Sequence, residues 1–262
     1  MAFFNRDKRN RVPWKIVDIH CHILPGVDDG SHSKSQSHRM LDLAWENDIR
    51  TIIATPHFLP EGRHPSPETL RSLVDELREY AALRQYDMEI YEGNESYYHQ
   101  EALELLEEEE ILSLAGSQYV LVEFSPADDA RYIRNALAEL QMAGYEPILA
   151  HVERYMSLCQ KPYDRIGELR EMGVLMQVNA GSIEGKMGPV AKKTVHSLLK
   201  KQWVDFVATD AHSDRSRSHA IGECVRILRK KYPAEYVESI LGGNARRILP
   251  ESGEDIHGTE IR

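Results

Sequence analysis

The chain has 262 residues, with 42 Asp plus Glu against 32 Lys plus Arg, a net charge of -10 and 42% hydrophobic residues. This composition is typical of a globular protein and argues against disorder, fibrous repeats and membrane insertion. The negative charge disfavours general nucleic-acid binding, because an acidic surface repels phosphate backbones. A barrel of about 250 residues is commonly one domain, so we expect a single domain over residues 13–249.

Both ends of the chain differ in composition from this domain. Residues 1–12 and 250–262 are polar and show no helical or strand periodicity, which predicts flexible tails. The first of these segments also lacks the apolar stretch of about 7 to 15 residues that a secretory signal requires. The 3 cysteines are an odd number without paired spacing, which fits reduced thiols. We therefore expect a cytoplasmic protein.

Short apolar segments alternate with longer amphipathic segments, a pattern typical of parallel strands joined by crossover helices. The predicted strands are residues 14–20, 50–57, 88–95, 119–123, 147–151, 174–179 and 203–210. The predicted helices are residues 34–48, 66–85, 99–110, 127–143, 163–172 and 188–201, with further helices after the last strand. Ser66 before Pro67 is a helix-capping pattern, and Gly144 and Gly173 stand where helices should end.

Residues that can bind a cation stand at the ends of nearly all predicted strands. They are His20, His22, His57, Glu95, Glu123, His151, Asp210 and His212, with Asp28 and Asp29 in the loop after the first strand. In a (β/α) barrel the carboxyl ends of the strands converge on one face, so these residues would meet there. Imidazoles and carboxylates without thiolate suit Mn, Fe or Zn. Because a catalytic zinc uses about three protein ligands, the set predicts two or three divalent ions.

Arginines close to these positions are candidates for substrate binding. Arg154 follows the fifth strand, and Arg215 and Arg217 follow the seventh. A guanidinium group there could hold a phosphate through two parallel hydrogen bonds. Asn179, at the end of the sixth strand, is expected to make either a hydrogen bond at the barrel rim or a substrate contact.

Other polar residues are assigned no catalytic role. Cys159 and Arg165 have the spacing of thiol-based tyrosine phosphatases, but Pro162 between them lacks the N–H that a phosphate loop needs, so we reject that mechanism. Surface or packing roles are expected for the histidines outside the strand ends, which are His32, His38, His64, His99, His196, His219 and His257.

The segments around the predicted ligands resemble a known superfamily. The motifs are Asp18-Ile-His20-Cys-His22, Thr51-Ile-Ile-Ala-Thr-Pro-His57, Gly93-Asn-Glu95, Tyr119-Val-Leu-Val-Glu123, Ala150-His151-Val-Glu-Arg154 and Thr209-Asp210-Ala-His212. They are similar to the polymerase and histidinol phosphatase (PHP) superfamily, and most closely to the bacterial manganese-dependent tyrosine phosphatases of capsule and exopolysaccharide loci. The resemblance covers about residues 15 to 250.

This resemblance implies a distorted (β/α)7 barrel with a trinuclear centre, in which Mn²⁺ is the expected metal. One ion would be held by His20, His22, Glu95 and Asp210, the second by Glu95, Glu123 and His151, and the third by Asp29, His57 and His212. Arg154, Glu95 and Asp210 would be catalytic, with a water activated between two ions as the nucleophile. Family members act on the tyrosine-rich tail of a membrane-associated bacterial tyrosine kinase, so a phosphotyrosine protein of this kind is the expected partner.

Three other functions are weighed against this one. The nearest is a phosphatase for a small metabolite such as histidinol phosphate, which would use the same metals in a more closed pocket. An amidohydrolase also begins with His-x-His, but Glu123 replaces its usual bridging lysine and Asn179 stands where it has a histidine. A non-enzymatic scaffold that binds a kinase would have no need to retain every expected ligand.

Overall fold

The computed structural model describes residues 14–61 and 64–250 of the chain. The two predicted tails, residues 1–12 and 250–262, lie outside the described residues apart from Pro250. Within the described residues, none of the helices combines the length and the hydropathy that crossing a bilayer demands.

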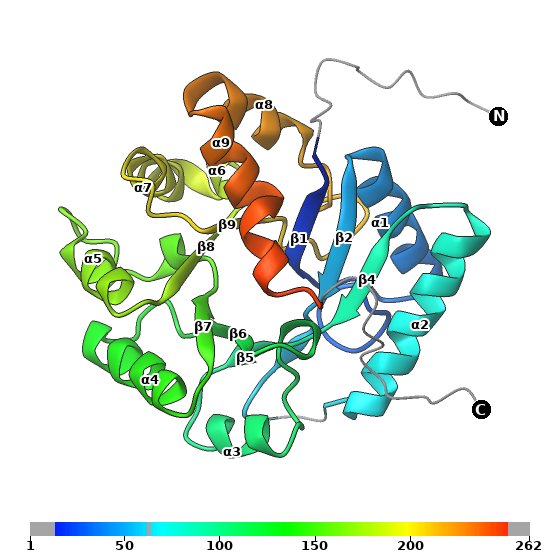
Figure 1. Ribbon diagram of the computed structural model, residues 1–262, viewed down its shortest axis with the longest axis horizontal. Helices are drawn as coiled ribbons and strands as arrows, with labels where there is room; N and C mark the ends of the chain where they lie inside the picture. The colour runs from blue at the N-terminus through cyan, green and yellow to red at the C-terminus, as the bar shows by residue number, and fades with distance from the viewer. Residues whose placement is uncertain (1–13, 62–63, 251–262) are drawn as a thin grey trace.

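Parallel strands surrounded by helices form a distorted barrel, as predicted (Figure 1). One sheet has the order β1-β2-β4, and its strands are Ile16–Cys21, Ile49–Ala54 and Glu89–Glu92. The other has the order β3-β5-β6-β7-β8-β9, with strands His57–Phe58, Glu95–Tyr97, Tyr119–Glu123, Glu146–Leu149, Leu175–Asn179 and Phe206–Ala208. The ends of β1 and β9 lie side by side, because Asp210 N donates to His20 O at 2.9 Å and His22 N donates to Ala211 O at 2.8 Å.

Two predicted strands are each interrupted, which corrects the prediction of continuous strands over 50–57 and 88–95. The first divides at Thr55 and Pro56 into β2 and β3, and the second divides at Gly93 and Asn94 into β4 and β5. Proline has no N–H to give to a neighbouring strand, so Pro56 favours the break. As a result β2 pairs with β4 while β3 pairs with β5, and His57 and Glu95 become partners in register.

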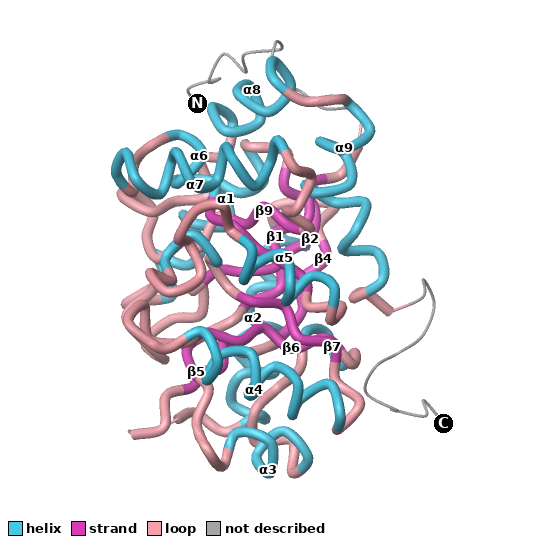
Figure 2. Tube along the Cα trace, turned by 90° about the vertical axis from the view of Figure 1, so that its left-hand side faces the viewer, coloured by secondary structure: helices cyan, strands magenta, loops and turns pink. Residues whose placement is uncertain are grey.

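The helices cover the outside of the barrel, and the tube view shows them around the strands (Figure 2). The predicted helices are present with shorter bounds as α1 (Lys34–Glu46), α2 (Pro67–Leu83), α3 (Ala102–Glu107), α4 (Ala130–Met142), α5 (Asp164–Glu171) and α7 (Gly188–Lys200). The helices expected after the last strand are α8 (Gly222–Lys231) and α9 (Ala234–Glu238). Helix α6 (Ala180–Glu184), directly after β8, was not predicted.

Local signals for the helix ends are confirmed. The Ser66 hydroxyl accepts the main-chain N–H of Thr69 at 3.3 Å, and Pro67 begins α2. Gly144 and Gly173 both have a φ of 93°, the left-handed conformation that a residue without Cβ adopts at little cost.

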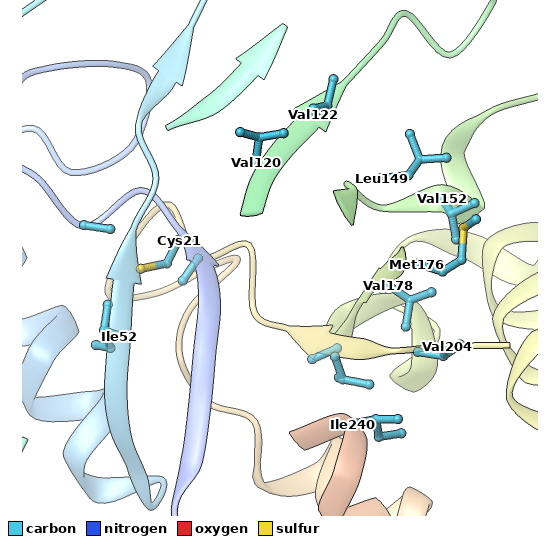
Figure 3. Close-up of a cluster of buried hydrophobic side chains, with 14 of the residues drawn as sticks. Cys21, Ile52, Val120, Val122, Leu149, Val152, Met176, Val178, Val204 and Ile240 are labelled. Atoms are coloured by element: carbon cyan, nitrogen blue, oxygen red, sulfur yellow. The ribbon is translucent and has the colours of Figure 1, made fainter. Parts of the chain in front are cut away.

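Two layers of buried side chains hold the barrel together. On β6, Leu121 packs with Val17 and Ile148 in one cluster, while Val120 and Val122 pack in the other, as the alternation of a strand requires. The close-up shows Val120 and Val122 along β6, facing the same cluster as Leu149 and Met176 (Figure 3).

The segment after α9 closes the amino-terminal end of the barrel. It consists of a π-helical turn, η4 (Ser239–Gly243), and a 3₁₀ turn, η5 (Asn244–Arg247), and it crosses in front of the strands in red (Figure 1). A Cβ on Gly242 would lie 2.5 Å from Lys15 O, so this close approach requires glycine. The opposite, carboxyl-terminal end of the strands is left for the functional site.

Candidate metal centre

All nine predicted ligands come together at the carboxyl ends of the strands, around the carboxylate of Glu95. Its Oε2 lies 3.2 Å from Nε2 of both His20 and His22, and 3.0 Å from Nδ1 of His57. Its Oε1 lies 2.7 Å from Nε2 of His151. One buried carboxylate therefore contacts four imidazoles that come from strand ends far apart in the sequence.

Two further carboxylates lie at the edges of this group. Glu123 Oε1 lies 3.1 Å from His57 Nδ1, and Glu123 Oε2 lies 3.5 Å from His151 Nε2. Asp210 Oδ1 lies 3.6 Å from His20 Nε2 and 3.5 Å from His22 Nε2. The Glu95 carboxylate thus stands between two others, which is the arrangement of a bridging ligand.

The outermost part of the site is formed by Asp29, His57 and His212. Asp29 Oδ1 lies 3.5 Å from His57 Nε2 and 3.3 Å from His212 Nε2. The Asp29 side chain is 68% exposed, whereas His212 is almost buried. This part of the site therefore opens to solvent.

The donor atoms themselves fit divalent cations. His57 Nδ1, Glu95 Oε2 and His212 Nε2 are buried and make no hydrogen bond within the described residues. Buried polar atoms are normally satisfied, and these lie instead in groups whose candidate ligand atoms are all within 4.8 Å of one another. The groups are His20-His22-Glu95, His20-His151-Asp210, His57-Glu95-Glu123 and His22-Asp29-His57-His212.

Asp28 lies where it can orient the proposed ligands His22 and His57, whereas the sequence predicted only that it lies in the loop after the first strand, within reach of the barrel rim. Its Oδ2 lies 2.7 Å from His22 Nδ1 and accepts the main-chain N–H of His57 at 3.1 Å. The loop that carries it turns back over His22 through a hydrogen bond from Ser31 N to His22 O at 3.0 Å. A Cβ on Gly30 would lie 2.3 Å from that carbonyl oxygen, so only glycine permits the turn.

Gln177, in the middle of β8, is a functional residue that the sequence analysis missed. Asp210 Oδ2 accepts a hydrogen bond from Asn179 Nδ2 at 2.6 Å, and Asn179 Oδ1 accepts one from Gln177 Nε2 at 2.9 Å. A carboxylate can only accept, so this series of hydrogen bonds fixes the amide orientations of Asn179 and Gln177. Gln177 Oε1 is therefore an acceptor, and it receives hydrogen bonds from His20 Nδ1 at 3.2 Å and His151 N at 2.7 Å. The Nε2 lone pair of His20 therefore faces the site. The available signal was a polar residue between the apolar Met176 and Val178.

Two of the predicted ligands have backbone conformations that are unusual for residues with a Cβ. His151 has a φ of 33° and Asp210 has a φ of 51°. Each lies two residues after the end of a strand; the His151 side chain contacts Glu95, and the Asp210 side chain lies close to His20. Strain of this kind is concentrated at functional sites, where the surrounding structure enforces it.

The carboxylates and imidazoles of the site shift one another's pKa strongly. Burial raises the pKa of Glu95, but His20, His151 and His22 outweigh burial and hold it well below the usual value. Burial lowers the pKa of His57, yet the carboxylates of Glu123 and Glu95 raise it to about 10. The proton that His57 retains at neutral pH therefore offsets negative charge of these two carboxylates.

The same two effects act on His151. Burial lowers its pKa, but the carboxylates of Glu123 and Glu95 outweigh burial and raise the pKa to about 9. Zinc, iron and manganese bind neutral imidazole, so a cation would have to displace these protons.

Two of the three arginines predicted to bind substrate form hydrogen bonds with Asp210. Arg154 NH2 donates to Asp210 Oδ2 at 2.6 Å, and Arg217 NH2 donates to Asp210 Oδ1 at 2.7 Å. Arg215 is exposed, and within the described residues its guanidinium group makes no hydrogen bond or ion pair. Two guanidinium groups thus converge on one anion at the edge of the site.

His219 is buried, in agreement with the packing role expected for it. Its Nε2 lies 3.6 Å from Asp18 Oδ2, and these two residues form a fifth group of candidate ligands with Cys21. The carboxylate of Asp18 already accepts both the N–H and the hydroxyl of Thr209. This group ties β1 to the end of β9 behind the site.

An α/β barrel with imidazoles and carboxylates gathered at the carboxyl ends of its strands defines a metal-dependent hydrolase of the barrel class. A family model described as capsular polysaccharide synthesis, CpsB/CapC, matches residues 16–250, and the chain belongs to this family. The predicted family resemblance is confirmed.

Relatives named as tyrosine-protein phosphatases match most of the chain. The chain is 34% identical over 240 residues to tyrosine-protein phosphatase CpsB of Streptococcus pneumoniae, with 89% of this chain and 98% of that protein covered. It is 32% identical over 234 residues to tyrosine-protein phosphatase YwqE of Bacillus subtilis (strain 168), with 89% and 91% covered.

Solved structures agree with this similarity. A chain from the crystal structures of YwqE from Bacillus subtilis and CpsB from Streptococcus pneumoniae, described as unique metal-dependent tyrosine phosphatases, gives a TM-score of 0.83 at 32% identity, with 89% of this chain and 94% of that chain covered. Histidinol phosphate phosphatase from Lactococcus lactis gives a TM-score of 0.54 at 13% identity, with 84% and 95% covered, which is a likeness of fold alone.

Proposed function

We propose that the chain is a metal-dependent protein-tyrosine phosphatase, a hydrolase of phosphoric monoesters that works in capsular polysaccharide synthesis. The observation that carries this proposal is the Glu95 carboxylate in contact with four imidazoles, with buried donor atoms that lack hydrogen-bond partners. Membership of the CpsB/CapC family and the similarity to phosphatases of that name support it.

The proposed ligand sets are those that the resemblance implies. They are His20, His22, Glu95 and Asp210 for one ion, Glu95, Glu123 and His151 for the second, and Asp29, His57 and His212 for the third. When bound, divalent cations would lower the pKa of water from 15.7 to about 7 and so make a nucleophile available near neutral pH. Mn²⁺ is the proposed metal, with Fe or Zn as alternatives, because the donor set holds nitrogen and oxygen without thiolate.

Arg154 and Arg217 would hold the phosphoryl oxygens. Both guanidinium groups already hold one anion, the Asp210 carboxylate, at 2.6 Å and 2.7 Å. Donors fixed in this way can stabilise the negative charge that develops on phosphorus oxygens in the transition state. The leaving group would be a phenolate whose conjugate acid has a pKa of about 10, so it departs without a strong general acid.

The proposed substrate is the phosphorylated tyrosine-rich tail of a membrane-associated bacterial tyrosine kinase, met in the cytoplasm. This is the partner that the family resemblance implies, and the solvent-exposed Asp29 side of the site leaves room for a polypeptide. A histidinol phosphate phosphatase is the alternative, but only the likeness of the barrel supports it.

The test is the hydrolysis of phosphotyrosyl peptide and of histidinol phosphate by purified protein, first stripped of metal and then loaded with Mn²⁺. We expect metal-dependent release of phosphate from the peptide, and loss of turnover together with bound metal in Glu95→Gln. A hundredfold preference for histidinol phosphate would reject the proposal. Anomalous scattering from a crystal of the loaded protein would count the ions and identify them.

A further inference from the structure

A cavity of about 340 Å³ opens beside the proposed metal centre, between α6 and the loop that follows β9. We name it the α6 cavity. Its polar end contains Asp210 and Asn179, and its walls include Gly181, Met187 and Ile221. The cavity therefore begins at the metal centre and extends away from it over an apolar surface.

The polar end is where a phosphate group would be held in the proposed reaction. Asn179 Nδ2 and Arg217 NH2 donate to opposite oxygens of the Asp210 carboxylate, at 2.6 Å and 2.7 Å. A phosphate bound by these donors leaves the rest of the α6 cavity for whatever carries the phosphate. A small metabolite would leave most of that space to water.

The apolar wall suits part of a polypeptide. Met187 is 43% exposed at the cavity although it is a large hydrophobic residue. Its flexible thioether can adapt to neighbouring side chains of different shape. Gly181 has no side chain and adds no bulk to the wall; a Cβ there would be in ordinary van der Waals contact with Lys186 and Met187.

The charge at the rim narrows the choice of polypeptide. Three cations line the α6 cavity, and two of them have a carboxylate partner: Arg217 pairs with Asp210, and Lys186 pairs with Glu184. Arg215 is exposed and has no ion pair or side-chain hydrogen bond among the described residues; the carboxylate of Asp214, which it influences at longer range, is paired with Arg39. In a chain of net charge -10, an unpaired guanidinium group at this place is complementary to a carboxylate on the substrate.

We propose that the α6 cavity binds the residues next to the phosphotyrosine of a protein substrate, and that Arg215 pairs with an Asp or Glu side chain among them. This inference rests on the proposed phosphatase function and adds a sequence preference to it. Arg215 acts on the flanking residue of the substrate, whereas Arg154 and Arg217 act on the phosphate.

The test compares phosphotyrosyl peptides that differ in one flanking residue, which is Glu, Gln or Lys, using the Mn²⁺-loaded full chain. An exposed ion pair contributes about 0.2 to 1 kcal/mol, so we expect kcat/KM to favour the Glu peptide over the Gln peptide by about 1.4- to fivefold at low salt. Added salt should reduce the ratio, because it screens exposed charges. In Arg215→Gln the ratio should fall to about one, and in Arg215→Glu the Lys peptide should become the better substrate.

Arg246→Gln is the matched control, because Arg246 is an exposed arginine of η5 at the opposite end of the barrel. It should keep the ratio of the unsubstituted protein. An equal kcat/KM for all three peptides, or an Arg215→Gln variant that keeps the Glu preference, would overturn the inference while leaving the phosphatase function standing. If the loaded protein hydrolyses no phosphotyrosyl peptide at all, both proposals fall together.

Discussion

Replacing Gln177 with Met should weaken metal binding without unfolding the barrel. The Gln177 side chain is buried and makes three hydrogen bonds: Oε1 accepts from His20 Nδ1 at 3.2 Å and from His151 N at 2.7 Å, and Nε2 donates to Asn179 Oδ1 at 2.9 Å. Methionine keeps the length and volume of glutamine but can make none of these bonds. His20 would then be free to turn or to exchange its tautomer.

The size of the effect follows from those three bonds. Loss of a partner that orients a ligating histidine typically weakens metal affinity by about 10- to 100-fold, which is about 1.4 to 2.7 kcal/mol. Each buried donor left without an acceptor costs about 1 to 3 kcal/mol of folding free energy. Two donors lose their acceptor when Gln177 is replaced, so the free energy of unfolding of the metal-free protein should fall by about 2 to 6 kcal/mol.

The assay is metal-dependent hydrolysis of para-nitrophenyl phosphate, with Mn²⁺ titrated into stripped protein. Gln177→Met should need about 10 to 100 times more metal for half-maximal rate and should recover most of its rate at saturation. Gln141→Met is the control, since Gln141 lies on α4 and its one side-chain hydrogen bond among the described residues is to Met172 O at 2.9 Å. An unchanged metal requirement in a folded Gln177→Met protein would refute the account of Gln177.

Three further predictions concern other parts of the site. Gly30→Ala places a Cβ 2.3 Å from His22 O and should lower the free energy of unfolding by about 1 to 3 kcal/mol along with metal content, measured by denaturant titration and metal analysis. Arg154→Ala should raise KM for a phosphotyrosyl peptide about tenfold or more while bound metal stays constant; loss of metal would instead make it a structural residue. Because the pKa of His57 is about 10 and that of His151 about 9, both carry protons at neutral pH and must lose them to bind a cation. Metal affinity should therefore rise with pH, first through about 9 as His151 loses its proton and then up to about 10 as His57 does. Calorimetry should detect the proton release as a dependence on the buffer, and the absence of that dependence would contradict these pKa values.

The sequence predicted the barrel and the gathering of the ligands for the same reason. Parallel strands place their carboxyl ends on one face whatever the details of their packing, so the order of residues along the chain is enough to locate a histidine or acid that follows an apolar run. His57 and Glu95 illustrate this, since they end separate predicted strands and lie in register on β3 and β5. Pro56 marks the first break in the sequence, but the neighbour with which each half of a strand pairs is decided by the tertiary structure.

Only the tertiary structure decided how the site is supported and where a substrate could extend from it. His20 and Gln177 are 157 positions apart and meet because the barrel closes between β9 and β1. Arg215 and Arg217 have the same local pattern, yet only Arg217 reaches Asp210, because the fold of their loop directs one guanidinium group inwards and leaves the other at the rim. Residue types at strand ends are a local property that the sequence records, whereas contacts between side chains depend on the curvature of the sheet and the course of its loops.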